Sequence, residues 1–284
     1  TDKNVESEIK MKEISLDERK EIELEILLYV TRLCEKNRID YSLCGGSLIG
    51  AIRHGGFIPW DDDIDIFLTR ENYKKLIDLL KDDLHYKLYA PETTENYLYG
   101  FCKLMDKRTV IYSEYDEEIG TPELGVFIDI YPVDLIPENK KEQRSFLRKL
   151  DFYLHCAYAA SNTMYAYGNT KLKHWIKKIV LFPKHLICRR KGTRYWMKKT
   201  EKIASEYLGT NAKLRGSVYS RYGSKEILPR KIYENTIEVS FEGYKIKIIK
   251  QYDKFLKRVY GDYMKLPPKE KQVLHHEYDE FWRE

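Results

Sequence analysis

The stretch from Cys44 to Leu68 reads Cys-Gly-Gly-Ser-Leu-Ile-Gly-Ala-Ile-Arg-His-Gly-Gly-Phe-Ile-Pro-Trp-Asp-Asp-Asp-Ile-Asp-Ile-Phe-Leu. It joins a glycine-rich turn, a short helix predicted over Leu48–Arg53 and an acidic strand predicted over Asp63–Leu68. Four aspartates fall within five residues, and their mutual repulsion costs stability unless a cation lies among them. The stretch therefore predicts a site that holds a divalent metal ion beside a phosphate group.

The acidic strand supplies the predicted metal ligands. Successive side chains of a strand point to opposite faces, so Asp63 and Asp65 share one face, with Cα atoms about 6.5–7 Å apart. A third carboxylate, Asp129, lies in another apolar strand, predicted over Gly125–Tyr131. If the two strands are neighbours, the three carboxylates form one metal site. Oxygen ligands with no Cys or His beside them favour Mg²⁺ or Mn²⁺ over Zn²⁺.

The glycine turn supplies the predicted phosphate site. Gly45 and Gly46 let a phosphate approach bare backbone. Ser47 is the predicted N-cap of the short helix, so its hydroxyl and the helix N-terminus offer hydrogen-bond donors. The stretch is not a Walker A motif, because the Lys-Ser/Thr pair that ends that motif is absent.

Hydrophobic periodicity and turn signals predict alternating helices and strands. The composition, 43% hydrophobic and 33% charged, is typical of a globular chain. The sequence has no run of about 18 apolar residues, so no transmembrane helix is predicted. No signal peptide is expected. Helices are predicted over 16–37, 69–84, 140–166, 193–208 and 251–260, strands over 39–44, 85–90, 97–105 and 109–112, and a hairpin over 236–241 and 244–249.

The five cysteines are far apart and form no Cys-x-x-Cys pair. This spacing argues against a disulfide framework or a zinc site and favours buried thiols in a reducing cytosol.

Three motifs together resemble a known family. The order of a Gly-Gly-Ser turn, Asp-x-Asp sixteen residues after its serine, and a lone later aspartate resembles the nucleotidyltransferase fold. The longer string from Gly45 to Ile66 looks like the LicD family of phosphorylcholine transferases. Ile-Asp-Ile-Tyr-Pro-Val-Asp at 128–134 resembles the second motif of that family. Phe-Glu-Gly at 241–243, Tyr-Asp at 252–253, Tyr-Gly-Asp-Tyr at 260–263 and Leu-Pro-Pro at 266–268 resemble its C-terminal signature.

The resemblance covers about 29–276, although 140–215 carries none of its motifs. Met105 departs from the basic residue expected at that point, which weakens a phosphate role for its strand. The fold implied is α/β (α+β), a nucleotidyltransferase-like mixed sheet flanked by helices. Residues 1–138 are expected to form the catalytic core. Residues 139–284 are expected to form a mostly helical part with a β-hairpin, which faces the acceptor or the membrane and packs on the core.

The resemblance implies transfer of phosphocholine from CDP-choline to a sugar hydroxyl of a lipid-linked cell-surface glycan precursor, of the teichoic acid or lipopolysaccharide type, with release of CMP. Asp63 and Asp65 would hold the metal, and Asp129 would ligate it or accept the proton of the acceptor hydroxyl. The glycines and the serine of the turn would bind phosphate oxygens. Arg53 is a bidentate phosphate candidate, with a solvated helix end as the alternative.

Choline carries a quaternary ammonium, which has no N–H to donate and is bound by aromatic faces and carboxylates. Trp60 and Asp62, beside the acidic strand, are the candidates closest in sequence. The 24 tyrosines supply further material, without showing which of them contribute.

The segment 171–200 holds eleven Lys or Arg and no Asp or Glu. Because the whole chain carries only +5, the remainder is net −6. Leu172, Trp175, Ile176 and Ile179 fall on one predicted helical face among these lysines. The pattern predicts a helix that lies on an anionic membrane, with a helix packed on the core as the alternative. A cytoplasmic enzyme, peripheral at the inner face of the membrane, follows. No nucleic-acid partner is expected, since the acidic remainder would repel a phosphate backbone.

Three other functions remain open from the sequence. A different CDP-linked alcohol phosphate, such as a polyol phosphate, would use the same fold. A glycosyltransferase with an Asp-x-Asp metal motif would leave the Gly-Gly-Ser turn unexplained. A binding module without turnover would leave the carboxylates unexplained.

Overall fold

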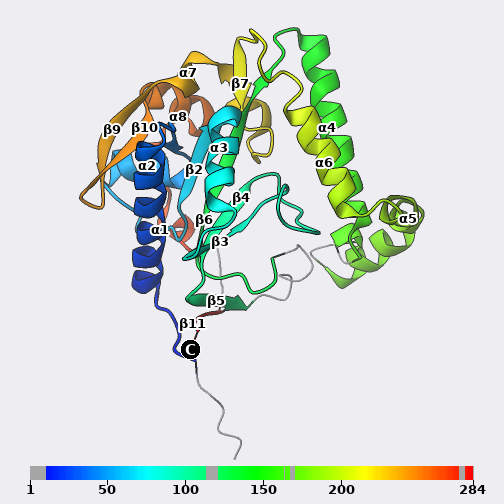
Figure 1. The fold of residues 1–284 in the computed structure, drawn as a ribbon, viewed down its shortest axis with the longest axis horizontal. Helices are drawn as coiled ribbons and strands as arrows, with labels where there is room; N and C mark the ends of the chain where they lie inside the picture. The colour runs from blue at the N-terminus through cyan, green and yellow to red at the C-terminus, as the bar shows by residue number, and fades with distance from the viewer. Residues whose placement is uncertain (1–10, 113–120, 163, 167–169, 275–278, 284) are drawn as a thin grey trace, which may run out of the picture.

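The structure is a computed structural model that describes residues 11–112, 121–162, 164–166, 170–274 and 279–283 (Figure 1). The elements run in this order: α1 (Leu16–Lys36), β1 (Ser42–Leu43), α2 (Gly45–Arg53), β2 (Asp65–Thr69), α3 (Arg70–Leu80), β3 (Tyr86–Tyr89), β4 (Cys102–Asp106), β5 (Thr109–Tyr112), β6 (Phe127–Ile136), α4 (Lys140–Ala160), η1 (Met164–Ala166), α5 (Lys171–Arg189), α6 (Thr193–Ala204), β7 (Leu214–Gly216), η2 (Gly223–Glu226), β8 (Leu228–Pro229), α7 (Lys231–Glu234), β9 (Thr236–Phe241), β10 (Tyr244–Ile249), α8 (Tyr252–Tyr260), η3 (Lys269–Lys271) and β11 (Asp279–Trp282).

A mixed sheet forms the centre, with strand order β1-β2-β6-β4-β3. β2 and β6 are parallel, while β1, β4 and β3 pair antiparallel to their neighbours. β7 and β8 extend the sheet along the second half of β6. The mixed α/β fold predicted from the sequence is confirmed.

β6 is longer than predicted and runs through Pro132. The Asp129 amide donates to the Ile64 carbonyl on the β2 side, so alternation turns the nitrogen of Pro132 toward the other edge. On that edge, β4 pairs only as far as Ile130 and β7 begins only at Asp134. The missing N–H of proline therefore falls between two partner strands and leaves no ladder bond broken.

α1 and α3 cover one face of the sheet, where α1 contacts β4 and β6 and α3 contacts β2, β3 and β6. Both begin at the caps that the sequence indicates. Ser15 and Glu18 form a capping box, and the Thr69 side chain accepts a hydrogen bond from the Asn72 amide. Apolar residues of both helices and of the sheet form the main core, including Ile26, Leu76 and Ile128, all at most 1% exposed.

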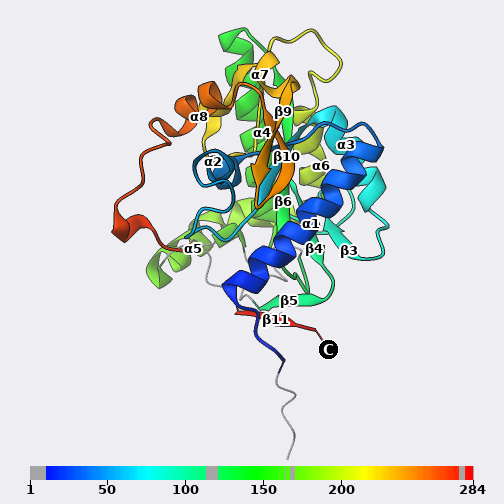
Figure 2. The same ribbon diagram turned by 90° about the vertical axis from the view of Figure 1, so that its left-hand side faces the viewer.

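The C-terminal third returns to this core. The hairpin β9–β10 packs against β1 and α2, and the Ile249 amide donates to the Ser42 hydroxyl at 2.8 Å. Phe241 and Phe255 are buried in the same hydrophobic cluster as α1 and β2. Figure 2 shows the hairpin beside α2 and α1, while Figure 1 shows α4, α5 and α6 on the opposite side of the sheet. The buried residues between 228 and 263 thus share one core with the first half of the chain. The division of the chain into two domains at residue 138 stays a prediction.

Several predicted ends differ from the structure. α4 ends at Ala160 and α6 at Ala204, both earlier than predicted. β4 begins only at Cys102, because the preceding loop turns to bury Leu98 against Ala157 of α4 and Met197 of α6. The hairpin is confirmed at both strands. All five cysteines are free and buried, as predicted.

A buried ion pair fixes α3 to β6. Arg70 and Asp134 are 2% and 0% exposed, and the guanidinium donates to both carboxylate oxygens at 2.7 and 2.8 Å. Asp134 is the last residue of the 128–134 motif. Its role in the structure is to hold Arg70, and thereby α3, against β6. A buried charge that loses its partner is strongly unfavourable, whereas loss of both charges can be nearly neutral.

We predict that Asp134→Leu lowers the free energy of unfolding by about 3–5 kcal/mol, because it leaves the Arg70 guanidinium buried and unpaired. The double variant Arg70→Met/Asp134→Leu should recover most of that loss in urea titrations. Lys247→Met, which removes a surface pair with Asp40, is the control and should cost at most about 1 kcal/mol. A single-variant loss as small as the control's would contradict the role of the pair.

Candidate active site

The two predicted acidic strands are neighbours. β2 and β6 pair in parallel with Asp65 directly opposite Asp129. Residues opposite each other in adjacent strands project from the same face, so the two carboxylates lie side by side. The predicted convergence of Asp65 and Asp129 is therefore confirmed by the strand register.

A second group of carboxylates lies immediately before β2. Asp61, Asp62 and Asp63 each place an oxygen within 4.8 Å of the others. Asp63 precedes the strand, which begins at Asp65, and the predicted strand start at Asp63 is two residues early. Asp61 is only 9% exposed, and burial, followed by repulsion from Asp63 and Asp62, raises its pKa to about 7. Burial, then Asp63 and Asp129, likewise raises the pKa of Asp65 well above its usual range.

Lys103 of β4 supplies the positive charge beside these groups. It lies opposite Asp129 in the antiparallel pair β4–β6, and its Nζ is 2.8 Å from Oδ1 and 3.2 Å from Oδ2 of that carboxylate. Its side chain is 8% exposed, with Nζ 3.7 Å from the centroid of the Phe127 ring. The family resemblance predicts a basic residue at Met105, and the lysine lies two positions earlier, on the same face of the strand. Met105 itself is buried.

Ser47 holds the acidic loop by its backbone. α2 begins at Gly45 with Cys44 as its N-cap, so the prediction of Ser47 as N-cap is wrong. The Ser47 hydroxyl accepts from the Asp65 amide at 2.8 Å and donates to the Asp63 carbonyl at 3.4 Å. Ser47 is 3% exposed. Its side chain therefore positions the Asp-x-Asp segment. This positioning role was not predicted from the sequence, and the expected phosphate contact of Ser47 stays a prediction.

The two glycines of α2 face the carboxylates. A Cβ atom at Gly45 would lie 2.5 Å from Oδ2 of Asp65, and one at Gly46 would lie 2.1 Å from Oδ2 of Asp61. Gly45 also adopts a positive φ of 57°. Only glycine lets the start of α2 approach the acidic groups this closely. The helix N-terminus and the carboxylates thus meet at one place, as the sequence predicts.

Arg53 has an anchoring role in the structure. Its Nη1 donates to the carbonyls of Tyr263 and Lys265 at 2.7 and 3.5 Å, and its Nε contacts His54 at 2.9 Å. These bonds tie the end of α2 to the segment after α8. The phosphate role of Arg53 stays a prediction.

Asp62 is buried in an ion-pair network. It is 1% exposed and pairs with Arg19 of α1 at 3.5 Å. Arg19 pairs in addition with Glu23 and with Glu280 of β11, so the acidic loop is fixed to α1 and β11. Trp60 is half-buried near His54, with ring centroids 6.1 Å apart. The choline-binding roles of Asp62 and Trp60 stay predictions.

A row of aromatic rings borders the carboxylates. Tyr99, Phe101 and Tyr131 follow one another with centroids 5.1 and 4.2 Å apart. The Tyr131 hydroxyl donates to Asp129 at 3.4 Å, and Lys103 lies over both Tyr99 and Phe101. These rings could not be selected from the sequence, because their proximity depends on the register of β4 and β6 and on the loop before β4.

The loop that leads to η2 adds one more cation. Arg221 stacks over Tyr222, and its pKa is raised, against the effect of burial, first by Tyr222 and then by Tyr260 and Asp65. Arg221 is exposed, and its charge interacts with that of Asp65. No motif marked this residue, since it comes from a part of the chain far from the acidic strand.

The donor set fits a hard divalent cation. Among the described residues, the carboxylates of Asp61, Asp62 and Asp63 lie close enough to share a metal ion, and buried like charges with raised pKa values are relieved by a cation. Asp63, Asp65 and Asp129 remain the predicted ligands, with Asp61 added by the geometry.

A family model described as LicD/FKTN/FKRP, nucleotidyltransferase domain, matches residues 38–248. The chain belongs to this family. The resemblance seen in the motifs is thereby confirmed, and the LicD family match includes α2, both acidic strands and the hairpin.

Individual relatives differ in how much of the chain they cover. The lipopolysaccharide cholinephosphotransferase LicD of Haemophilus influenzae is 35% identical over 280 residues, which is 94% of this chain and 97% of the relative. The uncharacterized protein RT0683 of Rickettsia typhi is 29% identical over 144 residues, 47% of this chain and 41% of its own. The ribitol 5-phosphate transferase FKRP of Mus musculus is 48% identical over 44 residues, 16% of this chain and 9% of its own. This LicD-family chain is an enzyme, a phosphotransferase.

We predict that Lys103→Met lowers the free energy of unfolding of the metal-free protein by about 1–3 kcal/mol, because Asp129 loses a buried cation beside Asp65. Lys103→Met/Asp129→Asn should regain most of the loss in urea titrations. Lys87→Met on the neighbouring β3, which faces Glu123 at the surface, is the matched control and should change stability little. Equal stability of Lys103→Met and wild type would show that the pair does not support the site.

Proposed function

We propose that this enzyme transfers phosphocholine from CDP-choline to a sugar hydroxyl of a lipid-linked glycan precursor and releases CMP. The observation that carries the proposal is the register of β2 and β6, which places Asp65 beside Asp129 at the glycine-rich start of α2. Support also comes from the lipopolysaccharide cholinephosphotransferase of Haemophilus influenzae, which matches over nearly its whole length. The acceptor is a glycan of the lipopolysaccharide or teichoic acid type.

The carboxylates would hold Mg²⁺ or Mn²⁺, which when bound neutralises negative charge on the diphosphate and on the departing CMP. Asp63 and Asp65 are the proposed ligands. Asp129 either completes the set or accepts the proton of the acceptor hydroxyl, and its contact with Lys103 orients it for both tasks.

Backbone and cationic groups would orient the donor. The start of α2 lies against the carboxylates at Gly45 and Gly46, and a helix N-terminus favours phosphate. Lys103 contacts Asp129 and the charge of Arg221 interacts with Asp65, so the diphosphate would meet positive charge from two other elements. A fixed position for the diphosphate aligns the phosphorus for in-line attack by the acceptor hydroxyl.

The aromatic row offers a place for the choline group. A quaternary ammonium is attracted to ring faces, and Tyr99, Phe101 and Tyr131 lie beside Asp129. Lys103 already lies over two of these rings, which shows that they accept a cation. Trp60 is a further candidate on the other side of the acidic loop.

Transfer of a polyol phosphate from a CDP-polyol is the second candidate. The observation that favours it is the local match to ribitol 5-phosphate transferase, at 48% identity over 44 residues. A polyol has hydroxyl groups and no positive charge, so it would gain little from the aromatic row.

We predict that the wild-type protein with Mg²⁺ and a glycan acceptor releases CMP from CDP-choline at least tenfold faster than from CDP-ribitol. EDTA should abolish the release, and Asp65→Asn should lower it at least a hundredfold. Because Asp65→Asn removes one of several repelling buried carboxylates, its thermal midpoint without metal should equal or exceed that of wild type. CMP is measured by chromatography and the midpoint by calorimetry.

Asp78→Asn on the exposed face of α3 is the matched control and should leave both readouts unchanged. Faster turnover of CDP-ribitol would establish the second candidate. Turnover that survives both EDTA and Asp65→Asn would refute a carboxylate-held metal.

A further inference from the structure

α5 packs on the rest of the protein by a narrow seam. His185 and Cys188 are buried, and the His185 Nδ1 contacts the Ala159 carbonyl at 2.9 Å. Cys188 shares a small cluster with Cys156 and Ala160 of α4. Figure 1 shows α5 at the edge of the molecule, beyond α4 and α6 and away from the sheet.

The apolar face of α5 points away from this seam. At about 100° per residue, its apolar side chains occupy an arc of roughly 160° centred opposite His185 and Cys188. They are between 40% and 72% exposed, and they are Leu172, Trp175, Ile176, Ile179, Val180, Phe182, Leu186 and Ile187. The alternative in which this helix buries its apolar residues in the core is therefore wrong. A continuous exposed patch of this kind marks an interaction surface.

Positive charges border the apolar face on both sides. The same helical geometry places Lys173 and Lys184 along one edge and Lys178 and Arg189 along the other. The ammonium of Lys178 lies 5.5 Å from the centroid of the Trp175 ring. The arrangement of an apolar arc with Trp, edged by Lys and Arg, is that of a helix lying in a lipid–water interface.

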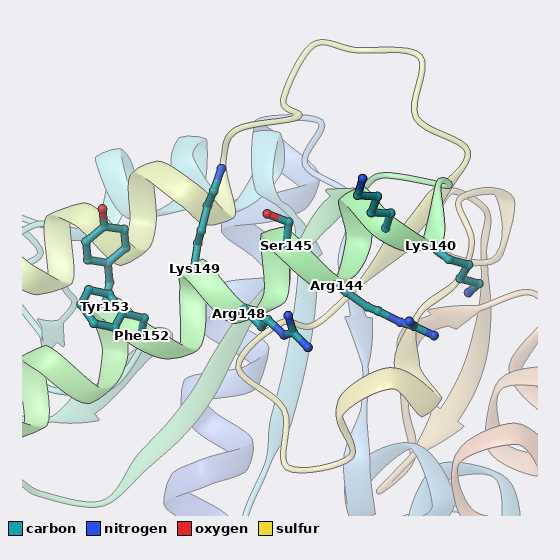
Figure 3. A pocket seen from close by; sticks show the side chains of 8 residues that line it. Lys140, Arg144, Ser145, Arg148, Lys149, Phe152 and Tyr153 are labelled. Atoms are coloured by element: carbon teal, nitrogen blue, oxygen red, sulfur yellow. The ribbon is translucent and has the colours of Figure 1, made fainter.

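A basic hollow on α4 adjoins the seam. Figure 3 shows the side chains that line this hollow, all of which come from α4. The hollow has a volume of about 770 Å³. Ser145, Lys149 and Phe152 of its lining lie on the same helical face as Cys156 and Ala160, where α5 packs. All of the charged residues that line it are cationic, namely Lys140, Lys141, Arg144, Arg148 and Lys149.

We propose that α5 and the basic hollow of α4 (together the α4–α5 surface) dock the enzyme on a membrane that carries anionic lipids. The apolar arc would enter the headgroup region, while the flanking lysines and arginines and the hollow bind lipid phosphates. Charge complementarity selects this occupant over a second copy of the chain. Two such faces would bring positive charge against positive charge, since residues 171–200 contain no Asp or Glu. None of the helices in the described ranges combines the length and apolarity needed to cross a bilayer.

The surface connects to the candidate active site through the loop before β4. Leu98 packs against Ala157 of α4 and Met197 of α6, and the next residue along is Tyr99 of the aromatic row. With α5 docked on a membrane, this loop would lie between the lipid that carries the acceptor and the aromatic row of the active site. The proposal goes beyond the transfer reaction and does not depend on the choice of donor.

Flotation of the full chain with vesicles tests the proposal. At low salt the wild type should float with vesicles of 30% phosphatidylglycerol and 70% phosphatidylcholine, bind pure phosphatidylcholine at least tenfold more weakly, and be released by 0.5 M NaCl. Trp175→Ser/Ile179→Ser should bind anionic vesicles at least tenfold more weakly. Lys173→Gln/Arg189→Gln should lose about as much on anionic vesicles and little on neutral ones.

Leu84→Ser, an apolar residue that is 86% exposed far from α5 in the sequence, is the matched control and should float like wild type. Circular dichroism should show unchanged helix content in each variant, and CMP release from CDP-choline with a soluble acceptor should stay at the wild-type rate. Failure of the wild type to float would overturn the proposal, as would equal flotation of the Trp175/Ile179 variant. A wild-type dimer in sedimentation that this variant loses would assign the surface to self-association instead.

Discussion

Repulsion among buried carboxylates governs the arrangement of this protein. Asp65 and Asp129 lie side by side on parallel strands, and Asp61 and Asp63 adjoin them at the entrance of β2. Burial and mutual repulsion raise the pKa of Asp61 and Asp65, so the folded chain holds these groups at a cost in stability. Lys103 offsets part of that cost. These groups stay together because the surrounding structure fixes them firmly, and the cation that we propose would lower the cost further.

The fixation comes mainly from contacts that the acidic residues do not make themselves. Ser47 binds the backbone on both sides of Ile64, so α2 and β2 move together. The ion pair of Arg70 with Asp134 fastens α3 beneath the same strands. Arg19 holds the acidic loop against α1 and β11. The pairs of Arg70 with Asp134 and of Arg19 with Glu280 join elements distant in sequence, and the second ties the C-terminal strand to α1.

Local patterns predicted the parts of the site, and long-range pairing decided their use. The alternation around Asp65 and Asp129 was sufficient to predict two acidic strands, because a lone carboxylate among isoleucines is unexpected in a buried strand. The structural partners of Arg53 and Asp62, the carbonyls after α8 and Arg19, could not be predicted because they lie far away in the chain. Lys103 and Arg221 were missed for the same reason. The helical period of α5 was visible in the sequence, but only the packing on α4 showed that its apolar side faces outward.

The parallel pairing of β2 and β6 also has a consequence for how the chain folds. Asp65 and Asp129 are separated by 64 positions in the sequence, with α3, β3, β4 and β5 between them. Parallel strands need a crossover connection, and contacts of such high order form late because loop closure precedes them. An unfolded chain keeps the neighbouring aspartates at 61–63 but cannot bring Asp129 to them. A divalent ion would therefore bind the completed topology far better than any folding intermediate, and its presence would favour the native state by mass action.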